Sequence, residues 1–208
     1  MLNFRSLRKK MVQDLKSKDI TNAKVLGAMS AIPRENFITE GFKKQAYEDE
    51  ALPLFEEQTI SQPYTVAFML QLLELKKGLN VLEIGTGSGY NSALISWIVN
   101  PGKVCTIEIN KKLFDFGKNN LKNYKNVRAI HADGSKGLPE KAPFDRIIVT
   151  AASPEIPSSL LHQLKDPGIL VAPIGPYYCQ EMVKLIKSKG KTETESYGSF
   201  IFVPLKGG

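Results

Sequence analysis

The stretch that most constrains the fold of this chain is residues 81–90, which read VLEIGTGSGY. Its first four residues predict a short buried strand, and its glycines allow positive φ angles and a close approach of the backbone to a ligand. A helical pattern follows from Asn91. A strand, a glycine loop and a helix in this order predict a nucleotide-type ligand at the carboxyl end of the strand.

The spacing of the glycines narrows the type of ligand. Gly85, Gly87 and Gly89 alternate with single residues, unlike the G-x-G-x-x-G of dinucleotide folds. Glu83 stands just before them, where a phosphate-binding loop gains nothing from a carboxylate. The loop therefore suits a cofactor without a pyrophosphate, although a glycine-rich turn is also an ordinary connection between a strand and a helix.

Length and composition predict one soluble domain. The 208 residues, 42% of them hydrophobic and 24% charged, are enough to bury a single core. We expect residues 1–75 to form a helical cap and a segment over the substrate, and residues 76–208 to form a cofactor-binding α/β core. No run approaches the roughly 20 apolar residues that span a bilayer, and the N-terminal sequence lacks the apolar core of a secretory signal. We therefore expect a cytoplasmic protein without a membrane partner.

The net charge of +7 raises the alternative of a nucleic-acid partner, because basic residues crowd positions 5–24. Leu7, Met11 and Leu15 recur there at helical spacing, so an amphipathic helix with a solvated basic face is the simpler interpretation. A positive field can still attract acidic substrates weakly. We expect no nucleic-acid partner.

The cysteines and histidines predict no metal site and no disulfide framework. Cys105 and Cys179 lie in apolar strand-like runs and match no metal spacing, so we interpret them as small buried hydrophobic residues. His131 lies inside an apolar strand and is expected in the core. His162 lies on a predicted helix and is expected at the surface.

Alternating strand and helix signals predict an α/β fold with a doubly wound, mostly parallel sheet. Helices are expected over residues 4–17, 22–31, 63–73, 91–99, 111–123 and 160–164, the first two as a helical cap. Strands are expected over residues 81–84, 104–109, 127–132, 144–150 and 169–174. Residues 181–187 and 199–205 alternate with period two and have no helix between them, so they predict an antiparallel C-terminal edge.

The longest irregular segment, residues 34–58, lies between the cap and the helix that begins at Pro63. A segment of this length without periodicity in a compact domain is more often a functional loop than filler. It leads directly into QTISQPY at residues 58–64. We expect residues 47–64 to close over the site.

Two acids end the second and third predicted strands, at Glu108 and Asp133. Ligands of doubly wound sheets bind outside the carboxyl ends of the strands, near the point where strand order reverses. An acid after the second strand can accept both hydroxyls of a ribose, and an acid or its neighbour after the third can meet an adenine amino group. Strand-end acids also cap turns or face water, but their combination with the glycine loop favours a cofactor site.

Residues 81–90 resemble the first motif of class I S-adenosylmethionine-dependent methyltransferases. Further segments resemble protein-L-isoaspartate O-methyltransferases, in the same order along the chain: QTISQPY at 58–64, DGSKG at 133–137, PFD at 143–145, IVTAA at 148–152, PEIP at 154–157, QE at 180–181 and FVPL at 202–205. The resemblance covers the chain from about residue 32 to its end, and Thr-Ile-Ser before Pro63 is its most specific part. It implies a Rossmann-like fold and S-adenosyl-L-methionine as cofactor, with S-adenosyl-L-homocysteine as product.

The resemblance also implies the reaction. Members of that family methylate the free α-carboxylate of L-isoaspartyl residues, which arise by aspartate isomerisation or asparagine deamidation. The ester closes to a succinimide that can reopen to aspartate, so the implied role is protein repair. The implied partners are damaged proteins and peptides, and the implied state is a monomer.

Individual roles are implied by the same resemblance. Ser61 is the implied catalytic residue. The implied cofactor-binding residues are Thr59, Ile60, Glu83, Gly85, Thr86, Gly87, Ser88, Glu108, Ile109, Asp133, Gly134 and Gln180. The implied substrate-binding residues are Ser61, Tyr64, Thr150 and Ala151. For Gln180, decoration of an edge strand is the alternative.

Two departures from related sequences concern the loop around the serine. Many related chains carry a glycine where this one has FEE at residues 55–57, and some carry a histidine in place of Tyr64. Both departures bear on the local shape of the loop.

The implied reaction needs no general base. An isoaspartyl carboxylate has a pKa of roughly 3 to 4, so it is already a nucleophile at neutral pH. The enzyme then has only to align the carboxylate oxygen with the methyl carbon and the sulfur, and to remove water from the carboxylate. The hydroxyl of Ser61 can suffice for this as a hydrogen-bond donor. The alternative role of Ser61 is a helix cap beside Pro63.

Two other functions stay open from the sequence. The basic N-terminal region favours a methyltransferase acting on RNA or DNA, but residues 150–154 lack the polar-Pro-Pro-aromatic motif of base-amino methylases, and no aromatic-basic strip is present. A binding module that has lost its chemistry is disfavoured by the intact Ser61, Glu108 and glycine loop.

Overall fold

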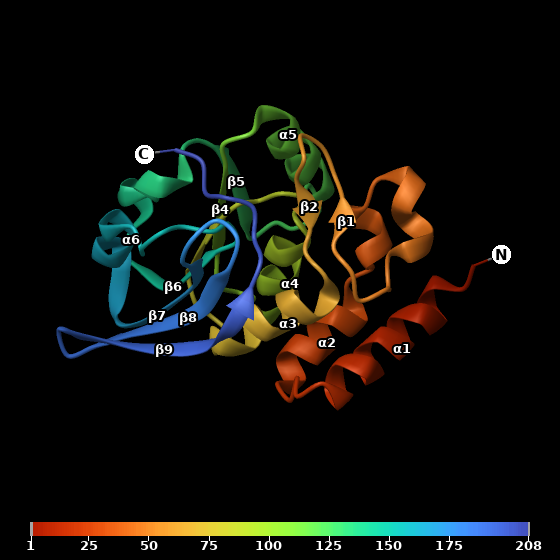
Figure 1. Ribbon diagram of the computed structural model, residues 1–208, viewed down its shortest axis with the longest axis horizontal. Coiled ribbons are helices and arrows are strands. Elements are labelled where there is room, and N and C mark those ends of the chain that lie inside the picture. Colours follow the sequence, from red (N-terminus) through yellow and green to blue (C-terminus); the bar gives the residue numbers. More distant parts are fainter. Residues whose placement is uncertain (1, 208) are drawn as a thin grey trace.

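The computed structural model describes residues 2–207, and its centre is a seven-stranded sheet with the order β5-β4-β3-β6-β7-β8-β9 (Figure 1). The strands are β3 (Val81–Ile84), β4 (Val104–Glu108), β5 (Val127–His131), β6 (Phe144–Val149), β7 (Leu164–Ile174), β8 (Gln180–Ser188) and β9 (Lys191–Phe200). Strands β3 to β7 are parallel, whereas β8 and β9 add an antiparallel edge. The predicted α/β class and its antiparallel edge are confirmed.

Strand order reverses beside β3. The chain passes from β3 outward to β4 and β5, and then returns to β6 on the other side of β3. Glu83 in β3 lies opposite Thr106 in β4 and Ile148 in β6. The carboxyl end of β3 is therefore the switch point at which sheets of this kind bind their ligands.

Helices cover both faces of the sheet. They are α1 (Phe4–Ser17), α2 (Ala23–Ala31), α3 (Pro63–Leu72), α4 (Tyr90–Val99), α5 (Lys111–Asn120) and α6 (Ser158–Gln163), with short 3-10 turns η3 (Gly134–Lys136) and η4 (Pro139–Lys141). Helices α1 to α4 share one hydrophobic cluster with the sheet, and α6 covers a second cluster. Helix α5 packs against β4 and β5.

The N-terminal helical cap is present as predicted, along the lower right edge of Figure 1. Asparagine side chains begin both of its helices: Asn3 accepts a hydrogen bond from Ser6 N at 3.1 Å, and Asn22 accepts one from Lys24 N at 3.0 Å. Helices α1 and α2 pack on each other and on α3, and α2 also packs on α4. The cap therefore supports the helix that follows the glycine loop.

The predicted position of the last strand is wrong. The partner of β8 is β9, Lys191–Phe200, not residues 199–205. The sequence of β9 is mostly polar because both faces of this edge strand are largely exposed, so it carries no apolar alternation. After β9 the chain leaves the sheet edge and pairs with Ala152, whose N–H donates to Val203 O at 2.7 Å. The apolar residues that suggested a strand instead cross the carboxyl ends of the strands.

Two predictions of burial are also wrong. Cys179 is exposed, because it lies in the turn between β7 and β8 and not inside a strand. His131 is exposed at the end of β5, which is an outer strand of the sheet. Cys105 is partly buried in β4, which raises the pKa of its thiol, and His162 is exposed as predicted.

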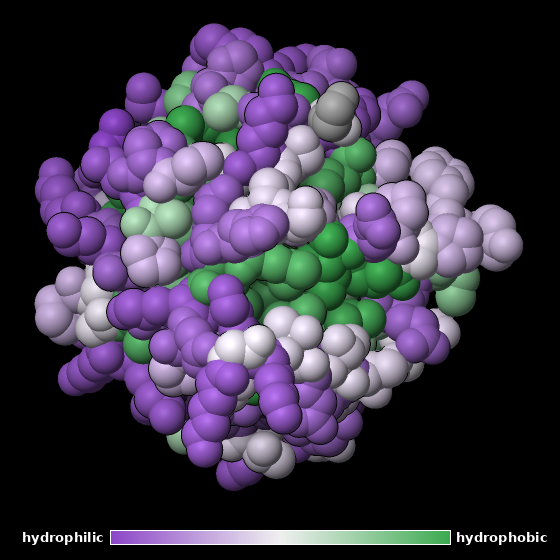
Figure 2. Space-filling model, turned by 90° about the vertical axis from the view of Figure 1, so that its left-hand side faces the viewer, coloured by the Kyte–Doolittle hydropathy of each residue, from purple (hydrophilic) through white to green (hydrophobic). Residues whose placement is uncertain are grey.

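The face drawn in Figure 2 is mainly hydrophilic. Figure 2 shows the side that lies at the left of Figure 1, where hydrophobic residues form a patch near the centre, surrounded by hydrophilic ones. Over residues 2–207, no helix has the length and apolar composition needed to cross a bilayer. The large hydrophobic side chains that are most exposed are Leu2, Trp97, Ile109, Tyr177, Tyr178 and Ile201.

The segment predicted to be irregular, residues 34–58, holds only short elements. They are η1 (Arg34–Phe37), η2 (Glu40–Gln45), and a small antiparallel hairpin of β1 (Leu52–Pro53) and β2 (Thr59–Ile60). At the hairpin tip, Glu56 and Glu57 have φ angles of 52° and 58°. This left-handed region favours glycine or asparagine, so two glutamates there strain the backbone of the tip.

Replacing Glu57 by glycine is expected to raise the free energy of unfolding by about 0.5–1 kcal/mol, because relief of the left-handed strain exceeds the added flexibility of the unfolded chain. Urea unfolding measures this. Glu50→Gly is the matched control: Glu50 is exposed in the same segment, has no positive φ angle, and should lose stability on the same change. A Glu57→Gly protein no more stable than the parent contradicts the idea of strain.

Candidate active site

The loop between β3 and α4 is held against both neighbouring strands. The N–H groups of Gly85 and Thr86 donate to Ile107 O at the end of β4, at 2.8 and 3.1 Å. The hydroxyl of Thr150, after β6, donates to Gly85 O at 3.0 Å and lies 2.3 Å from the position that a Cβ atom on Gly85 would take, which is too close for any side chain. Gly87 has a φ of 51°, and a Cβ there would meet no atom within 4 Å. The loop is thus closely packed at its start and open beside Gly87.

Glu83 lies behind this loop and is fully buried. Its carboxylate accepts hydrogen bonds from Asn91 Nδ2 and Thr106 Oγ1, both at 2.7 Å, and from the hydroxyl of Ser92. Burial raises the pKa of Glu83 to about 7. Glu83 lines neither the pocket beside Glu108 nor the cavity beside Ser88, and its three hydrogen bonds support the loop and α4 from inside the protein.

Glu108 ends β4 and faces the glycine loop. One carboxylate oxygen accepts from Gly87 N and the other from Asn110 N, each at 3.0 Å. A carboxylate has about four acceptor positions, so these two bonds orient the group and leave acceptor capacity for a ligand. Glu108 is buried and lines the pocket beside the loop.

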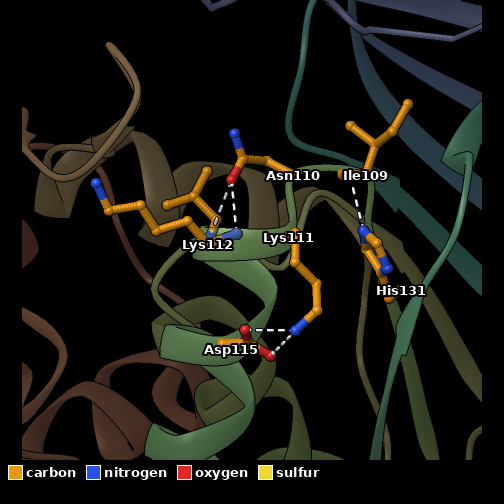
Figure 3. Close-up of polar contacts among 7 residues, drawn as sticks. Ile109, Asn110, Lys111, Lys112, Asp115 and His131 are labelled. Atoms are coloured by element: carbon orange, nitrogen blue, oxygen red, sulfur yellow. Dashed lines mark hydrogen bonds and ion pairs between the residues drawn. The ribbon is translucent and has the colours of Figure 1, made fainter.

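Figure 3 shows the residues that follow Glu108 in the chain, at the start of α5. The side chain of Asn110 accepts from Lys112 N at 3.0 Å and from Leu113 N at 3.1 Å, which caps the helix. The Nε2 atom of His131 lies 3.1 Å from Ile109 O, at hydrogen-bonding distance. Both contacts hold the main chain of residues 109–110 in place, while the side chain of Ile109 lines the pocket.

This pocket collects the ends of several strands and the C-terminal segment. Its walls include Thr59, Gly85, Gly87, Glu108, Ile109, Gly134, Thr150, Ala151 and residues 203–206. A smaller cavity that also borders the loop is lined by Thr59, Ile60, Ser61, Gly85, Thr86, Gly87, Ser88 and Thr150, among others. Most residues that the sequence assigns to the site therefore come together.

Ser61 is partly buried and lies just before α3. Among residues 2–207, no hydrogen bond uses its hydroxyl, and α3 has no side-chain cap from its own N-terminal residue, Gln62. Asp49 takes that place: its Oδ1 accepts from Tyr64 N at 2.8 Å. Ser61 is therefore not the cap of this helix.

Ser61 also lines a groove whose lining includes no residue of the glycine loop. It has a volume of about 520 Å³, and its lining contains no charged residue among those described. Ser61, Thr59 and Thr150 form its inner end, and the exposed side chains of Tyr178 and Ile201 stand at its rim. A second hollow that includes Tyr64 shares Tyr178 and Ile201 with it.

Asp133 and Gln180 lie beside the site but line none of these cavities. Asp133 Oδ1 accepts from the N–H and the hydroxyl of Ser135, at 2.9 and 2.7 Å, and so begins η3. Gln180 is fully buried: its amide donates to Tyr177 O at 2.9 Å and accepts from Phe202 N at 2.8 Å. Gln180 thus ties together two segments that border the groove.

Comparison with known proteins accords with this geometry. The model of the family described as protein-L-isoaspartate(D-aspartate) O-methyltransferase matches residues 6–208. A protein-L-isoaspartate O-methyltransferase of Methanoculleus marisnigri is 45% identical over 96% of this chain and 91% of its own. The one of Pyrococcus horikoshii is 47% identical over 96% and 92%. The chain belongs to the protein-L-isoaspartate(D-aspartate) O-methyltransferase family.

A solved structure shares the fold over the whole length. It is a putative protein-L-isoaspartate O-methyltransferase of Plasmodium falciparum in complex with S-adenosyl-L-homocysteine, 27% identical, with a TM-score of 0.86 and 99% of both chains covered. The predicted family and its Rossmann-like methyltransferase fold are confirmed.

Periodicity in the sequence does not indicate three parts of the candidate site in this family member. Residues 203–206 form a pocket wall, and the only signal for them was the motif FVPL. Asp49 caps α3 from fifteen residues before Tyr64, without a local motif. Arg34 binds Ser61 O from a segment that showed no pattern.

Proposed function

We propose that this chain is a protein repair methyltransferase that transfers the methyl group of S-adenosyl-L-methionine to the free α-carboxylate of L-isoaspartyl residues. Membership of the family supports this activity. The observation that carries the proposal is the position of Ser61. Its hydroxyl is engaged by none of residues 2–207, and the residue lines both the cavity at the glycine loop and the uncharged groove.

The residues of the pocket fit S-adenosyl-L-methionine. The acceptor capacity left on Glu108 suits two ribose hydroxyls, and Ile109 and Gly134 would border the adenine. The open space beside Gly87, together with Thr59, would take the methionine part. When bound, the cofactor supplies a methyl group on a sulfonium, and S-adenosyl-L-homocysteine is the product.

Three of the expected cofactor-binding residues are proposed to act indirectly. Glu83 holds the glycine loop from inside the protein, with its oxygens taken by Asn91, Ser92 and Thr106. Asp133 shapes the turn that places Gly134 on the pocket wall. Gln180 fixes the border of the groove.

The chain's own residues align the reactants and exclude water. The Ser61 hydroxyl would donate to one oxygen of the substrate carboxylate and leave the other oxygen free to accept the methyl group; the carbon–sulfur electron pair would remain with the sulfur of the bound cofactor. No general base is required, since the carboxylate is ionised at neutral pH. Neither His131 nor His162 lines these cavities.

The groove is proposed to bind the peptide on either side of the isoaspartyl residue. Thr150 and Ala151 would contact the reacting residue, and Tyr64 would contact a flanking one. The described lining of the groove has no charged side chain that could bind the carboxylate in place of Ser61. The groove would therefore hold the peptide by shape and by apolar contacts.

Incubation with methyl-labelled S-adenosyl-L-methionine tests the function. We expect label in an isoaspartyl peptide as a base-labile ester, and none in the matched aspartyl peptide or in RNA. Label in RNA supports the rival methyltransferase, and cofactor binding without transfer to any of the three supports a binding module. Either result overturns the proposal.

We also propose a single methyltransferase domain, with residues 1–75 as the cap and substrate segment and 76–208 as the cofactor-binding core. The shared hydrophobic cluster of α1 to α4 and the sheet supports this unity. A monomer in the cytoplasm, without nucleic-acid or membrane partners, completes the proposal. Sedimentation equilibrium measures the mass of the protein in solution and so tests the proposed monomeric state.

A further inference from the structure

Arg34 is a fully buried arginine that has no carboxylate partner among the described residues. It lies at the start of η1, directly after Pro33. Burial lowers the pKa of its guanidinium to about 10, so the group remains charged at neutral pH. The Asp49 carboxylate favours the charged form of Arg34, but the two groups form no ion pair, and burial of a charge outside an ion pair is costly for stability.

The hydrogen bonds of Arg34 join two ends of one segment. Its Nε donates to Ala46 O at 2.8 Å, and its Nη2 donates to Ser61 O, also at 2.8 Å. Ala46 precedes the β1–β2 hairpin and Ser61 follows it. The fixed fork of one guanidinium therefore closes the whole hairpin segment at its base.

The same group contacts the region after the glycine loop. The guanidinium carbon lies 5.1 Å from the centre of the Tyr90 ring, in a cation–π arrangement. Tyr90 is fully buried and is the first residue of α4, directly after Gly89. Arg34 thus places the main chain of Ser61 relative to the helix that begins at the glycine loop.

We propose that Arg34 is a positioning residue for methyl transfer, which sets the Ser61 hydroxyl against the glycine loop by binding the carbonyl oxygens of Ala46 and Ser61 at once. This inference rests on the proposed function of the site. Lysine carries the charge but not the fork, so it can bind one carbonyl well but cannot hold both in this geometry.

Kinetics of Arg34→Met and Arg34→Lys test the proposal, well below the melting temperature of each protein. With saturating cofactor, kcat for an isoaspartyl peptide should fall about tenfold to a hundredfold in Arg34→Met, since displacement of an aligned group by about 1 Å has effects of that size. Arg34→Lys should lie between the parent and Arg34→Met. The affinity for S-adenosyl-L-homocysteine and the KM for the peptide should change about twofold at most.

Arg8→Met is the matched control. Arg8 also donates to a main-chain carbonyl, Ala31 O at 3.5 Å, and lies 6.0 Å from the ring of Tyr47, but it belongs to α1 and lines none of the site cavities. Its kcat should equal that of the parent. Hydrogen exchange gives a second readout: residues 46–62 should exchange faster in Arg34→Met and not in Arg8→Met.

The outcomes separate this inference from the function it rests on. An inactive parent chain overturns the proposed function. An active parent with full kcat in folded Arg34→Met overturns the inference and leaves Arg34 with a structural role, visible only as a lower melting temperature. If Arg34→Met does not fold, Arg34→Lys decides: reduced kcat with retained cofactor affinity supports the inference, and parental kcat overturns it.

Discussion

Replacing Ser61 by alanine is expected to slow methyl transfer to an isoaspartyl peptide about tenfold to a thousandfold, the range for one positioned hydrogen-bond donor. Cofactor affinity and melting temperature should stay nearly unchanged, because no hydrogen bond within residues 2–207 uses this hydroxyl. Single-turnover methylation, calorimetric titration with S-adenosyl-L-homocysteine and thermal unfolding of the same protein check the three quantities.

Two further variants control for effects on the fold. Asp49→Ala removes the acceptor for Tyr64 N at the start of α3 and should lower stability by about 1 kcal/mol, the usual cost of losing a cap. Ser17→Ala removes a hydroxyl that bonds to Asp14 O on α1 and should leave methyl transfer at the parental rate. Full activity in a destabilised Ser61→Ala protein would contradict the role of Ser61 in orienting the substrate carboxylate.

Glu108→Ala is expected to weaken binding of S-adenosyl-L-homocysteine by roughly 1.5–3 kcal/mol, or about tenfold to 150-fold, from the loss of charge-assisted hydrogen bonds to the ribose. The same carboxylate accepts from Gly87 N and Asn110 N, so its removal also loosens the loop that borders the cofactor. Isothermal titration calorimetry gives the dissociation constant directly.

Glu108→Gln distinguishes the two contributions. It keeps the shape of the side chain, but its amide nitrogen can no longer accept, so the loss of affinity should be smaller than in the alanine variant. Glu140→Ala, at an exposed position on η4, is the control for removing a negative charge. An unchanged dissociation constant in folded Glu108→Ala removes this residue from the cofactor site.

The elements that the sequence predicted well are those whose signal is local. Residues 81–90 specify a strand, a turn with positive φ angles and a helix within ten positions, and the structure has all three there. Burial on both faces made the parallel strands β3, β4 and β6 recognisable as apolar runs. Parallel strands end at the same edge of a sheet, so the acids at the ends of the second and third strands were expected near the glycine loop. Glu108 does lie on the wall of the pocket beside that loop.

Local signals failed where the environment of a residue depends on distant chain. β9 is a strand because it pairs with β8, although its exposed polar residues show no apolar period. Residues 201–205 are apolar but belong to no strand of the seven-stranded sheet; the segment pairs with Ala152, and residues 203–205 line the pocket at the carboxyl ends of the strands. For Glu83, expected from the sequence to bind the cofactor, the structure adds that its carboxylate accepts hydrogen bonds from Thr106 and Ser92, and its role toward the cofactor stays a prediction.

By itself, the sequence determined the family, the α/β order and the position of the glycine loop, because backbone freedom, side-chain periodicity and motifs are properties of neighbouring residues. Only the tertiary structure decided which groups hold Ser61. The Arg34 fork reaches Ser61 O across 27 positions, and Asp49 reaches the N–H of Tyr64 across 15. Such contacts form only when the packed core brings separate segments to hydrogen-bonding distance, and no short sequence pattern records that distance.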